Sequence, residues 1–172
     1  MVILIAGASH TGKTLLAQRI LEERHYPYLS IDHLKMGLIR SGNTDLTPMD
    51  DEEMTGYLWP IVREMVKTAI ENEQNLVVEG CYIPADWMDS FSEEYRCHIS
   101  YVCLILSSDY IRTQFDKIRK FGSVIEKRLD DSGLDMGALI RDNEANLVLC
   151  RKYGNPYILV EEKYEIPLGI AF

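Results

Sequence analysis

The chain opens with a short apolar segment that runs directly into a glycine-rich turn. Residues 2–6 read VILIA, and residues 7–14 read GASHTGKT, which fills every fixed position of the pattern G-x-x-x-x-G-K-[ST]. In this pattern the glycines let the backbone curl so that successive N–H groups point inward at a bound phosphate. We call residues 7–14 the phosphate turn; its predicted binding residues are Gly7, Ala8, Ser9, His10, Thr11, Gly12, Lys13 and Thr14.

The residues around the phosphate turn favour the same interpretation. The apolar run before it predicts a buried strand, and apolar residues recur at helical spacing within residues 14–24. A bound phosphate would lie at the N-terminus of that helix, which carries a partial positive charge and unpaired N–H donors. Lys13 can reach the β- and γ-phosphates, and the Thr14 hydroxyl can bind Mg²⁺. An accidental glycine-rich turn is the alternative interpretation.

The composition limits the partners that we expect. The net charge of −9 repels long polyanions, so we expect neither duplex nucleic acid nor an anionic membrane as a partner. No apolar run approaches the ~20 residues that span a bilayer, and Met1 leads into the first strand rather than into a basic leader. We therefore expect a cytoplasmic protein. Its oligomeric state is not constrained by the sequence.

The four cysteines are the next group that could carry chemistry. Cys81, Cys97, Cys103 and Cys150 form no C-x-x-C pair and have no histidine partner at zinc spacing. We expect reduced thiols in the core, with a catalytic cysteine as a remote alternative.

Apolar runs alternate with amphipathic segments along the whole chain. This alternation is typical of βαβ units and predicts an α/β fold of three layers, a parallel sheet with helices on both faces. Pro60 should kink or interrupt a long helix, and residues 41–53 should be a mobile connection. The length of 172 residues fits one domain, residues 1–172. We expect strands at 2–6, 28–31, 75–79, 99–106 and 157–161, and helices at 14–24, 50–73, 84–91, 109–121, 124–129 and 134–153.

Polar side chains follow three of the predicted strands. Ligands bind beyond the carboxyl ends of the strands in open parallel sheets. Lys13 and Thr14 follow the first strand, Asp32 the second, and Glu79 ends the third. Together they outline a site for phosphoryl transfer, which is catalysed mainly by positioning and by charge stabilisation.

With these residues the chain resembles the small P-loop kinases. That group includes adenylate, shikimate and gluconate kinases, chloramphenicol phosphotransferase, the zeta-toxin kinases and the kinase domain of polynucleotide kinase. The resemblance covers most of the chain as an order of elements, and the phosphate turn is its specific part. It implies a five-stranded parallel sheet in the order 2-3-1-4-5, ATP and Mg²⁺ on the phosphate turn, a helical lid at about residues 109–130, and an acceptor pocket beside the second and third strands.

The resemblance suggests roles for the two acidic residues. Asp32 stands where several relatives that phosphorylate a hydroxyl keep an acid, which can orient the acceptor O–H and accept its proton. Polynucleotide kinase-like members have an arginine three residues later, where this chain has Lys35. Glu79 occupies the position of the Walker-B aspartate and would support Mg²⁺ or the acceptor. The alternatives are an N-cap for Asp32 and a solvated strand end for Glu79.

Basic residues are dense in the region of the predicted lid. Arg112 and Arg119 are seven residues apart, which places them on one face of a helix. In the related kinases, lid arginines close over ATP and neutralise charge on the transferred group. A solvated helix face is the alternative. The basic residues of this region are Arg112, Lys117, Arg119, Lys120, Lys127 and Arg128, and Arg141 could reach the phosphates from the next helix.

The acceptor site is less sharply defined. We expect Lys35, Arg40 and Tyr82 to bind the acceptor together with Asp32, since cations mixed with aromatic rings suit an anionic or ring-bearing molecule. Trp59 and Arg63 lie in the same segments, and the position of Trp59 among helical apolar repeats favours the core. Residues 161–167 border the adenine or form a plain turn.

These observations predict an ATP- and Mg²⁺-dependent kinase that phosphorylates a small-molecule acceptor, with a hydroxyl group as the expected target. Catalysis would depend on Lys13, Asp32, Glu79, Arg112 and Arg119, with Thr14 and Glu79 at the metal and Arg112 also at the nucleotide. Two alternatives stay open. One is a nucleoside monophosphate kinase, whose acceptor is a phosphate, and the other is an NTP-binding regulatory module that hydrolyses slowly.

Overall fold

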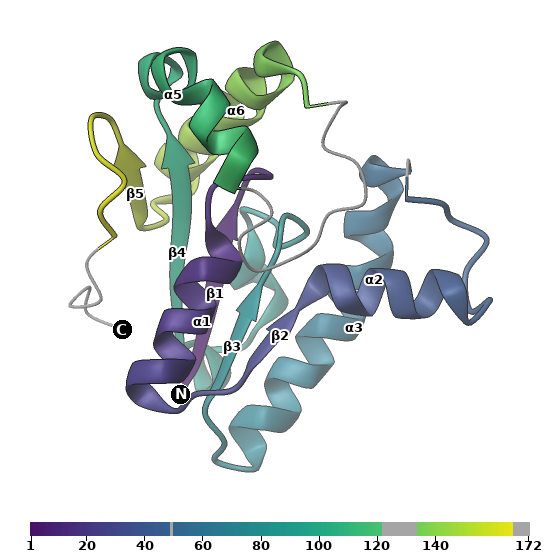
Figure 1. Ribbon diagram of the computed structural model, residues 1–172. Helices are drawn as coiled ribbons and strands as arrows, with labels where there is room; N and C mark the ends of the chain where they lie inside the picture. The colour runs from purple at the N-terminus through teal and green to yellow at the C-terminus, as the bar shows by residue number, and fades with distance from the viewer. Residues whose placement is uncertain (49, 122–133, 167–172) are drawn as a thin grey trace.

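The computed structural model describes residues 1–48, 50–121 and 134–166. Within these residues the centre of the molecule is a five-stranded sheet in which all paired strands are parallel (Figure 1). The strand order β2-β3-β1-β4-β5 confirms the order that the resemblance implies. The strands are β1 (Val2–Gly7), β2 (Tyr28–Ser30), β3 (Leu76–Glu79), β4 (Ile99–Leu106) and β5 (Tyr157–Val160).

Helices follow the strands in the predicted order. They are α1 (Lys13–Arg24), α2 (Ile31–Arg40), α3 (Asp51–Glu71), the 3₁₀ helix η1 (Trp87–Ser90), α4 (Glu93–Arg96), α5 (Ser108–Phe121) and α6 (Met136–Tyr153). Helix α3 continues through Pro60 without interruption. The segment predicted as a helix at 84–91 contains only the short η1, and the predicted helix at 124–129 lies outside the described residues.

The sheet buries both of its faces, which gives the three-layer α/β/α arrangement that the sequence predicts. Along β1, Ile3 and Ile5 pack against α1, whereas Val2 and Leu4 pack on the opposite side in the cluster that contains α3. Alternation in a strand sends successive side chains to opposite faces. A strand covered on both faces therefore appears in the sequence as the continuous apolar run at residues 2–6.

The parallel arrangement brings the ends of three strands to one edge. In the register of the sheet, Glu79 lies beside Ile5 on one side and beside Ser30 on the other. The phosphate turn follows β1, and Asp32 lies in the first turn of α2, directly after β2. The residues predicted for the site therefore leave the sheet next to one another.

The prediction that all four cysteines lie in the core is wrong for two of them. Cys103 and Cys150 are buried, but Cys81 and Cys97 are exposed. Cys81 follows β3 at the edge where the strands end, and Cys97 lies directly after the short surface helix α4. No helix in the described part of the chain combines the length and the apolar character that a membrane span needs.

Candidate active site

The phosphate turn has a backbone that only particular residues can adopt. Gly7 has φ 141°, and a Cβ placed there would meet the carbonyl oxygen of Leu104 at 2.4 Å. Gly12 has φ 84° and is the N-cap of α1, with no side chain capping the helix. The N–H groups in the first turn of α1 are therefore not taken by a capping side chain, and they can bind an anion.

Side chains within the turn hold its shape. The Thr11 hydroxyl donates to the carbonyl oxygen of Ala8 over 2.9 Å, and Lys13 Nζ donates to the same oxygen over 2.8 Å. Both side chains are buried, Thr11 completely and Lys13 to all but 6%. The Lys13 ammonium group is therefore held against the phosphate turn, where it is predicted to bind the phosphates.

The lysine is surrounded by groups from two other segments. Lys13 Nζ lies 3.4 Å from Cys81 Sγ. Burial by itself lowers the pKa of Lys13, but the Coulomb attraction of Cys81, Glu79 and Asp32 outweighs burial and raises the pKa above its ordinary value. Lys13 therefore keeps its charge at physiological pH, and both predicted carboxylates lie within electrostatic reach of it.

Thr14 and Glu79 form the part of the site that could hold a metal. The Thr14 hydroxyl donates to Glu79 Oε1 over 3.2 Å, and Glu79 is 1% exposed. Octahedral Mg²⁺ binds oxygen at about 2.0–2.1 Å, which places neighbouring ligand oxygens about 3 Å apart. The pair fits Mg²⁺ in chemistry and in spacing. Among the described residues no cluster of three or more His, Cys, Asp or Glu side chains offers a metal cage, and Mg²⁺ commonly takes its remaining ligands from phosphates and water.

Asp32 does not cap α2. The N-cap residue is Ser30, and Asp32 lies inside the first turn of the helix, so the capping interpretation is wrong. Its carboxylate is still favoured there by the helix dipole. Asp32 is half-buried and lines the pocket described next. The carboxylate is thus placed to contact a ligand.

A pocket of about 880 Å³ opens beside the phosphate turn. Its walls come from the turn, from α2, from the segment before α3 and the first turns of α3, from the residues after β3, and from α6. The lining residues are Gly7, Ala8, Ser9, Asp32, Lys35, Met36, Pro48, Thr55, Cys81, Tyr82, Asp142, Ala145 and Asn146. This volume is within the range of small-molecule sites.

Two of the predicted acceptor residues meet in this pocket. Lys35 Nζ donates to the Tyr82 hydroxyl through a short hydrogen bond and to the Pro48 carbonyl oxygen over 3.3 Å. The same ammonium lies 4.9 Å from the centroid of the Tyr82 ring. Both residues are 7% exposed. The pair therefore places a buried positive charge in the pocket wall.

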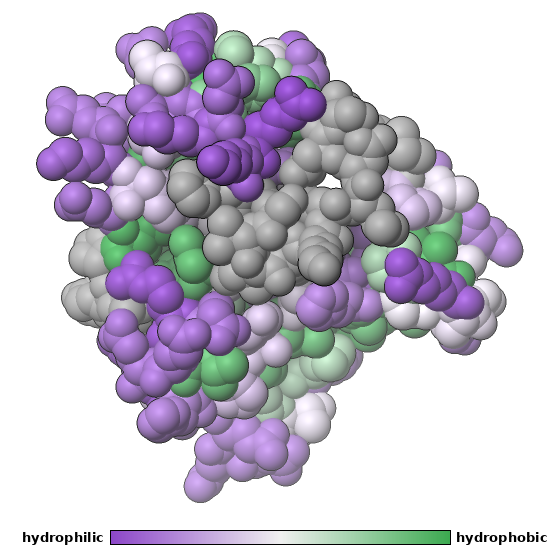
Figure 2. Space-filling view, in the orientation of Figure 1, coloured by the Kyte–Doolittle hydropathy of each residue, from purple (hydrophilic) through white to green (hydrophobic). Residues whose placement is uncertain are grey.

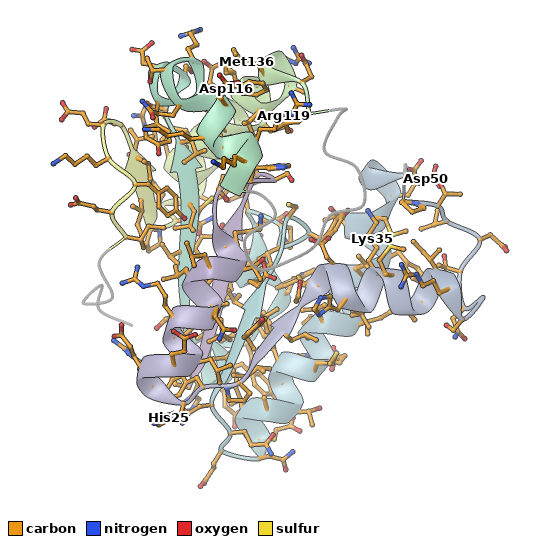
Figure 3. The ribbon with its side chains drawn as sticks, in the orientation of Figure 1. His25, Lys35, Asp50, Asp116, Arg119 and Met136 are labelled. Carbon is orange, nitrogen blue, oxygen red and sulfur yellow. The ribbon has the colours of Figure 1, made fainter. Side chains whose placement is uncertain are left out.

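The predicted arginines do not line the pocket. Arg112 is exposed on α5 and forms an ion pair with Asp109 at 3.1 Å. Arg119 is exposed near the end of α5, and Figure 3 shows it well apart from Lys35. Hydrophilic residues dominate the surface over α5 in Figure 2. Arg40 is exposed at the end of α2. Their roles at ATP or acceptor stay predictions.

The structure also shows where three other residues from the sequence analysis lie, namely Arg63, Arg141 and Trp59. Arg63 pairs with Glu64 at 2.7 Å on α3, and Arg141 pairs with Asp135 at 3.7 Å. Trp59 lies in the core, as its position among apolar repeats predicts, and donates to Ser90 Oγ over 2.9 Å. Lys127 and Arg128 lie outside the described residues.

Sequence reasoning missed the wall that α6 contributes. Asp142, Ala145 and Asn146 lie on one face of α6 because they are spaced three and four residues apart. No motif marks these residues, and only the packing of α6 brings them to the pocket.

Sequence reasoning also missed the position of Cys81 in the pocket wall beside Lys13. Its one signal is its position just after Glu79 and Gly80 at the end of β3. Burial raises the pKa of this thiol, and Asp32 and Glu79 raise it further while Lys13 lowers it. Cys81 keeps accessible surface and lines the pocket.

The last described segment contacts the phosphate turn from outside the pocket. The Tyr164 hydroxyl donates to the carbonyl oxygen of Thr11 over 2.8 Å, and a Cβ on Gly12 would meet that hydroxyl oxygen at 1.7 Å. Arg19 donates to the carbonyl oxygen of Ile166 over 2.9 Å. This segment therefore packs on the turn, and a contact with adenine stays a prediction.

Comparison with known proteins identifies the fold. No family model and no curated protein sequence matches the chain. Among solved structures, a deoxyadenosine kinase from M. mycoides aligns over 93% of this chain and 90% of its own, with a TM-score of 0.54 and 14% identity. A sugar kinase from Janibacter sp. aligns over 93% and 84%, with a TM-score of 0.56 and 12% identity. A shikimate kinase from Bacteroides thetaiotaomicron aligns over 95% and 90%, with a TM-score of 0.53 and 15% identity. The chain has the fold of the small P-loop kinases, as its sequence predicts.

Proposed function

We propose that this protein is a kinase that uses ATP and Mg²⁺ to phosphorylate a hydroxyl group on a small molecule. One observation carries the proposal: the phosphate turn with the buried Lys13, the hydrogen-bonded pair of Thr14 and Glu79, and a pocket lined by Asp32 lie side by side at the ends of three strands. The kinases that share the fold add support at the level of architecture. A buried lysine at a phosphate turn, with two carboxylates at the same edge of the sheet, suits transfer of a phosphoryl group.

Each residue has a role in this proposal. The N–H groups of the turn and Lys13 hold the phosphates, while Thr14 and Glu79 would hold Mg²⁺, which when bound would neutralise charge on the phosphates. Asp32 orients the acceptor hydroxyl. As the acceptor oxygen forms a bond to the γ-phosphorus, the bond from that phosphorus to the bridging oxygen breaks, ADP takes the electron pair, and Asp32 takes the hydroxyl proton.

The position of Asp32 favours a hydroxyl over a phosphate as the acceptor. A phosphate acceptor is already ionised at neutral pH and needs no base. A carboxylate in the pocket beside Lys13 would instead repel such an acceptor. The proposal therefore places hydroxyl phosphorylation ahead of nucleoside monophosphate phosphorylation.

The test follows the γ-phosphoryl group. Wild-type protein and Lys13→Ala are incubated with Mg²⁺ and ATP or GTP labelled in the γ-phosphate, together with a cell extract of small molecules. We expect wild-type protein to transfer the label to a small molecule, which mass spectrometry then identifies, and we expect no transfer by Lys13→Ala. Release of label only as inorganic phosphate would instead support the NTP-hydrolysing module.

A further inference from the structure

The Tyr164 hydroxyl contacts the backbone of the phosphate turn. It donates to the Thr11 carbonyl oxygen over 2.8 Å. A Cβ on Gly12 would meet the same hydroxyl oxygen at 1.7 Å, so the ring comes this close only because residue 12 has no side chain. Tyr164 is not among the residues that line the pocket. Its contact with the site is therefore a contact with the main chain of residues 11 and 12.

This hydrogen bond sets the direction of one peptide unit. The peptide bond between Thr11 and Gly12 is trans, and in a planar trans peptide the C=O and N–H bonds point in opposite directions. The Thr11 carbonyl points toward Tyr164, so the Gly12 N–H points away from it. Gly12 is the N-cap of α1, and the N–H groups at a helix N-terminus are donors that bind anions. The direction of this peptide therefore decides whether a donor or an acceptor faces a bound phosphate.

The turn has little else that opposes rotation of this peptide. Gly12 has φ 84°, and glycine takes positive and negative φ about equally readily. The Thr11 hydroxyl donates to the Ala8 carbonyl oxygen over 2.9 Å, which holds the Thr11 side chain but not the peptide that follows it. Rotation would turn the partly negative Thr11 carbonyl oxygen toward a phosphate, and the two would repel each other. Tyr164 supplies a donor that opposes this rotation.

The segment that carries Tyr164 is attached to the helix that follows the turn. Arg19, on α1, donates to the Ile166 carbonyl oxygen over 2.9 Å. Ile166 is buried in one apolar cluster with Leu16 and Ala17 of α1, and the Tyr164 ring packs against this cluster. Burial raises the pKa of the Tyr164 phenol, which therefore keeps the proton that it donates. The hydroxyl is thus presented to the turn from a support that is fixed to α1.

We propose that Tyr164 is a positioning residue for the nucleotide, because its hydrogen bond to Thr11 holds the Thr11–Gly12 peptide with the Gly12 N–H toward the phosphates. This inference rests on the proposed function for the identity of the ligand. Tyr164 acts through the main chain of the turn and does not itself contact the reacting atoms. Its role is at the phosphates, and not at the adenine that residues 161–167 could border.

The first test compares two ligands that share their phosphates. AMP-PNP is a non-hydrolysable analogue of ATP, and tripolyphosphate has three phosphates but no nucleoside. Each is titrated calorimetrically, with Mg²⁺, into wild-type protein and into Tyr164→Phe, which keeps the ring but lacks the hydroxyl. We expect Tyr164→Phe to bind both ligands about three- to tenfold more weakly, because it loses one hydrogen bond of ordinary net strength.

Tyr57 provides a matched control for Tyr164. Its hydroxyl donates to the Asn43 carbonyl oxygen over 2.9 Å, which is the same kind of bond outside the phosphate turn. Tyr57 lies on α3 and is not among the lining residues of the pocket. We expect Tyr57→Phe to bind both ligands as tightly as wild-type protein. Equal losses in Tyr57→Phe and Tyr164→Phe would show a general effect of removing a tyrosine hydroxyl and would overturn the inference.

A second measurement observes the peptide itself by NMR. The sequence contains two Thr-Gly pairs, Thr11–Gly12 and Thr55–Gly56. Threonine labelled with ¹³C at the carbonyl and glycine labelled with ¹⁵N therefore select the signals of these two peptides, and Gly56, within α3, is the internal reference. In wild-type protein we expect both ligands to shift the Gly12 amide signal. In Tyr164→Phe we expect the Thr11 carbonyl signal to change before any ligand is added, while the Gly56 signal stays in place.

Three results would overturn the inference. One is unchanged affinity of Tyr164→Phe for AMP-PNP. Another is a loss of affinity for AMP-PNP with unchanged affinity for tripolyphosphate, which would place Tyr164 against the nucleoside. The third is a Thr11–Gly12 peptide whose signals are the same in wild-type protein and in Tyr164→Phe.

The two proposals fail separately. If AMP-PNP does not bind to wild-type protein, the proposed function is wrong. The NMR signals of the Thr11–Gly12 peptide in wild-type protein and in Tyr164→Phe, with and without tripolyphosphate, then still decide whether Tyr164 directs the Gly12 N–H toward a phosphate.

Discussion

Lys13 lies among acidic groups whose positions suit them to different roles. Glu79 is buried and bonded to the Thr14 hydroxyl, whereas Asp32 is half-buried and lines the pocket. A buried carboxylate beside a hydroxyl suits a metal, and a carboxylate open to the pocket suits a substrate. Substituting each acid in turn can therefore distinguish the roles of Asp32 and Glu79.

Asp32→Asn should reduce turnover much more than it reduces nucleotide affinity. The amide keeps the size of the side chain but cannot accept the acceptor proton, a contribution of about 10²–10⁴ in rate. Steady-state kinetics and ATP titration of the variant measure the two effects, with the exposed Asp89→Asn as a control. Comparable losses in turnover and in ATP affinity would show that Asp32 has a structural role instead.

Glu79→Gln should change the metal requirement. The amide retains the shape of the buried side chain but loses the charge that attracts Mg²⁺, so ATP binding should need about tenfold more Mg²⁺. Titrating Mg²⁺ at fixed ATP measures the change. An unaltered Mg²⁺ dependence would exclude Glu79 from the metal site.

The two exposed cysteines should differ in reactivity. Only the thiolate reacts with iodoacetamide, and burial raises the pKa of Cys81, so less thiolate forms there at any pH below that value. We expect Cys97 to be alkylated faster at pH ~7.5, and we expect Cys81 labelling to increase with pH and to slow when Mg²⁺ and AMP-PNP are bound. Peptide mass spectrometry after timed labelling gives both rates. Faster labelling of Cys81 at neutral pH would contradict the described environment of its sulfur.

At the scale of elements, α2 is held against the end of β3 by a close contact. A Cβ on Gly80 would lie 2.8 Å from the Cβ of Ile31, the first residue of α2. Real Cβ atoms do not approach so closely, so an alanine at Gly80 must push α2 away from the sheet. Because Asp32 follows Ile31 directly, the shift would move the Asp32 carboxylate, which the proposed function makes the base, as well.

Gly80→Ala should therefore lower both stability and turnover. We expect a loss of about 1–3 kcal/mol in the free energy of unfolding, since overpacking in a core costs this much. Gly37→Ala is the matched control, because Gly37 lies within α2 and a Cβ there meets no atom within 4 Å. The Gly37→Ala variant should be as stable as wild-type protein or slightly more stable. Chemical denaturation and turnover measurements compare Gly80→Ala with Gly37→Ala. Equal stability and equal turnover in the two variants would contradict the close contact between Gly80 and Ile31.

The elements also show what local sequence can and cannot predict. The strands are predictable because burial on both faces leaves continuous apolar runs, and Gly154 ends α6 in the left-handed conformation that glycine favours. Pro60 is misleading, because α3 continues through it with the proline ring exposed to solvent. The 3₁₀ helix η1 and the short α4 are too brief for periodicity to define them.

At the scale of the whole molecule, the candidate site combines a part that is local in sequence with a part that is not. The phosphate turn is contiguous, and its geometry depends on residues such as Gly7 and Gly12, so the sequence predicts it directly. Asp32 and Glu79 are predictable because parallel strands end at one edge. The α6 wall and Tyr164 reach the site only through tertiary packing. No sequence pattern in their own segments predicts that they lie there.

The central claim is that residues 7–14 bind the phosphates of a nucleoside triphosphate with Mg²⁺. Calorimetric titration of Mg²⁺ and ATP into wild-type protein, Lys13→Ala and the control Lys67→Ala tests this claim most directly. We predict binding at a single site in the wild-type and Lys67→Ala proteins and loss of that binding in folded Lys13→Ala. Equal affinity in all three proteins, or no binding to the wild-type protein, would contradict the account.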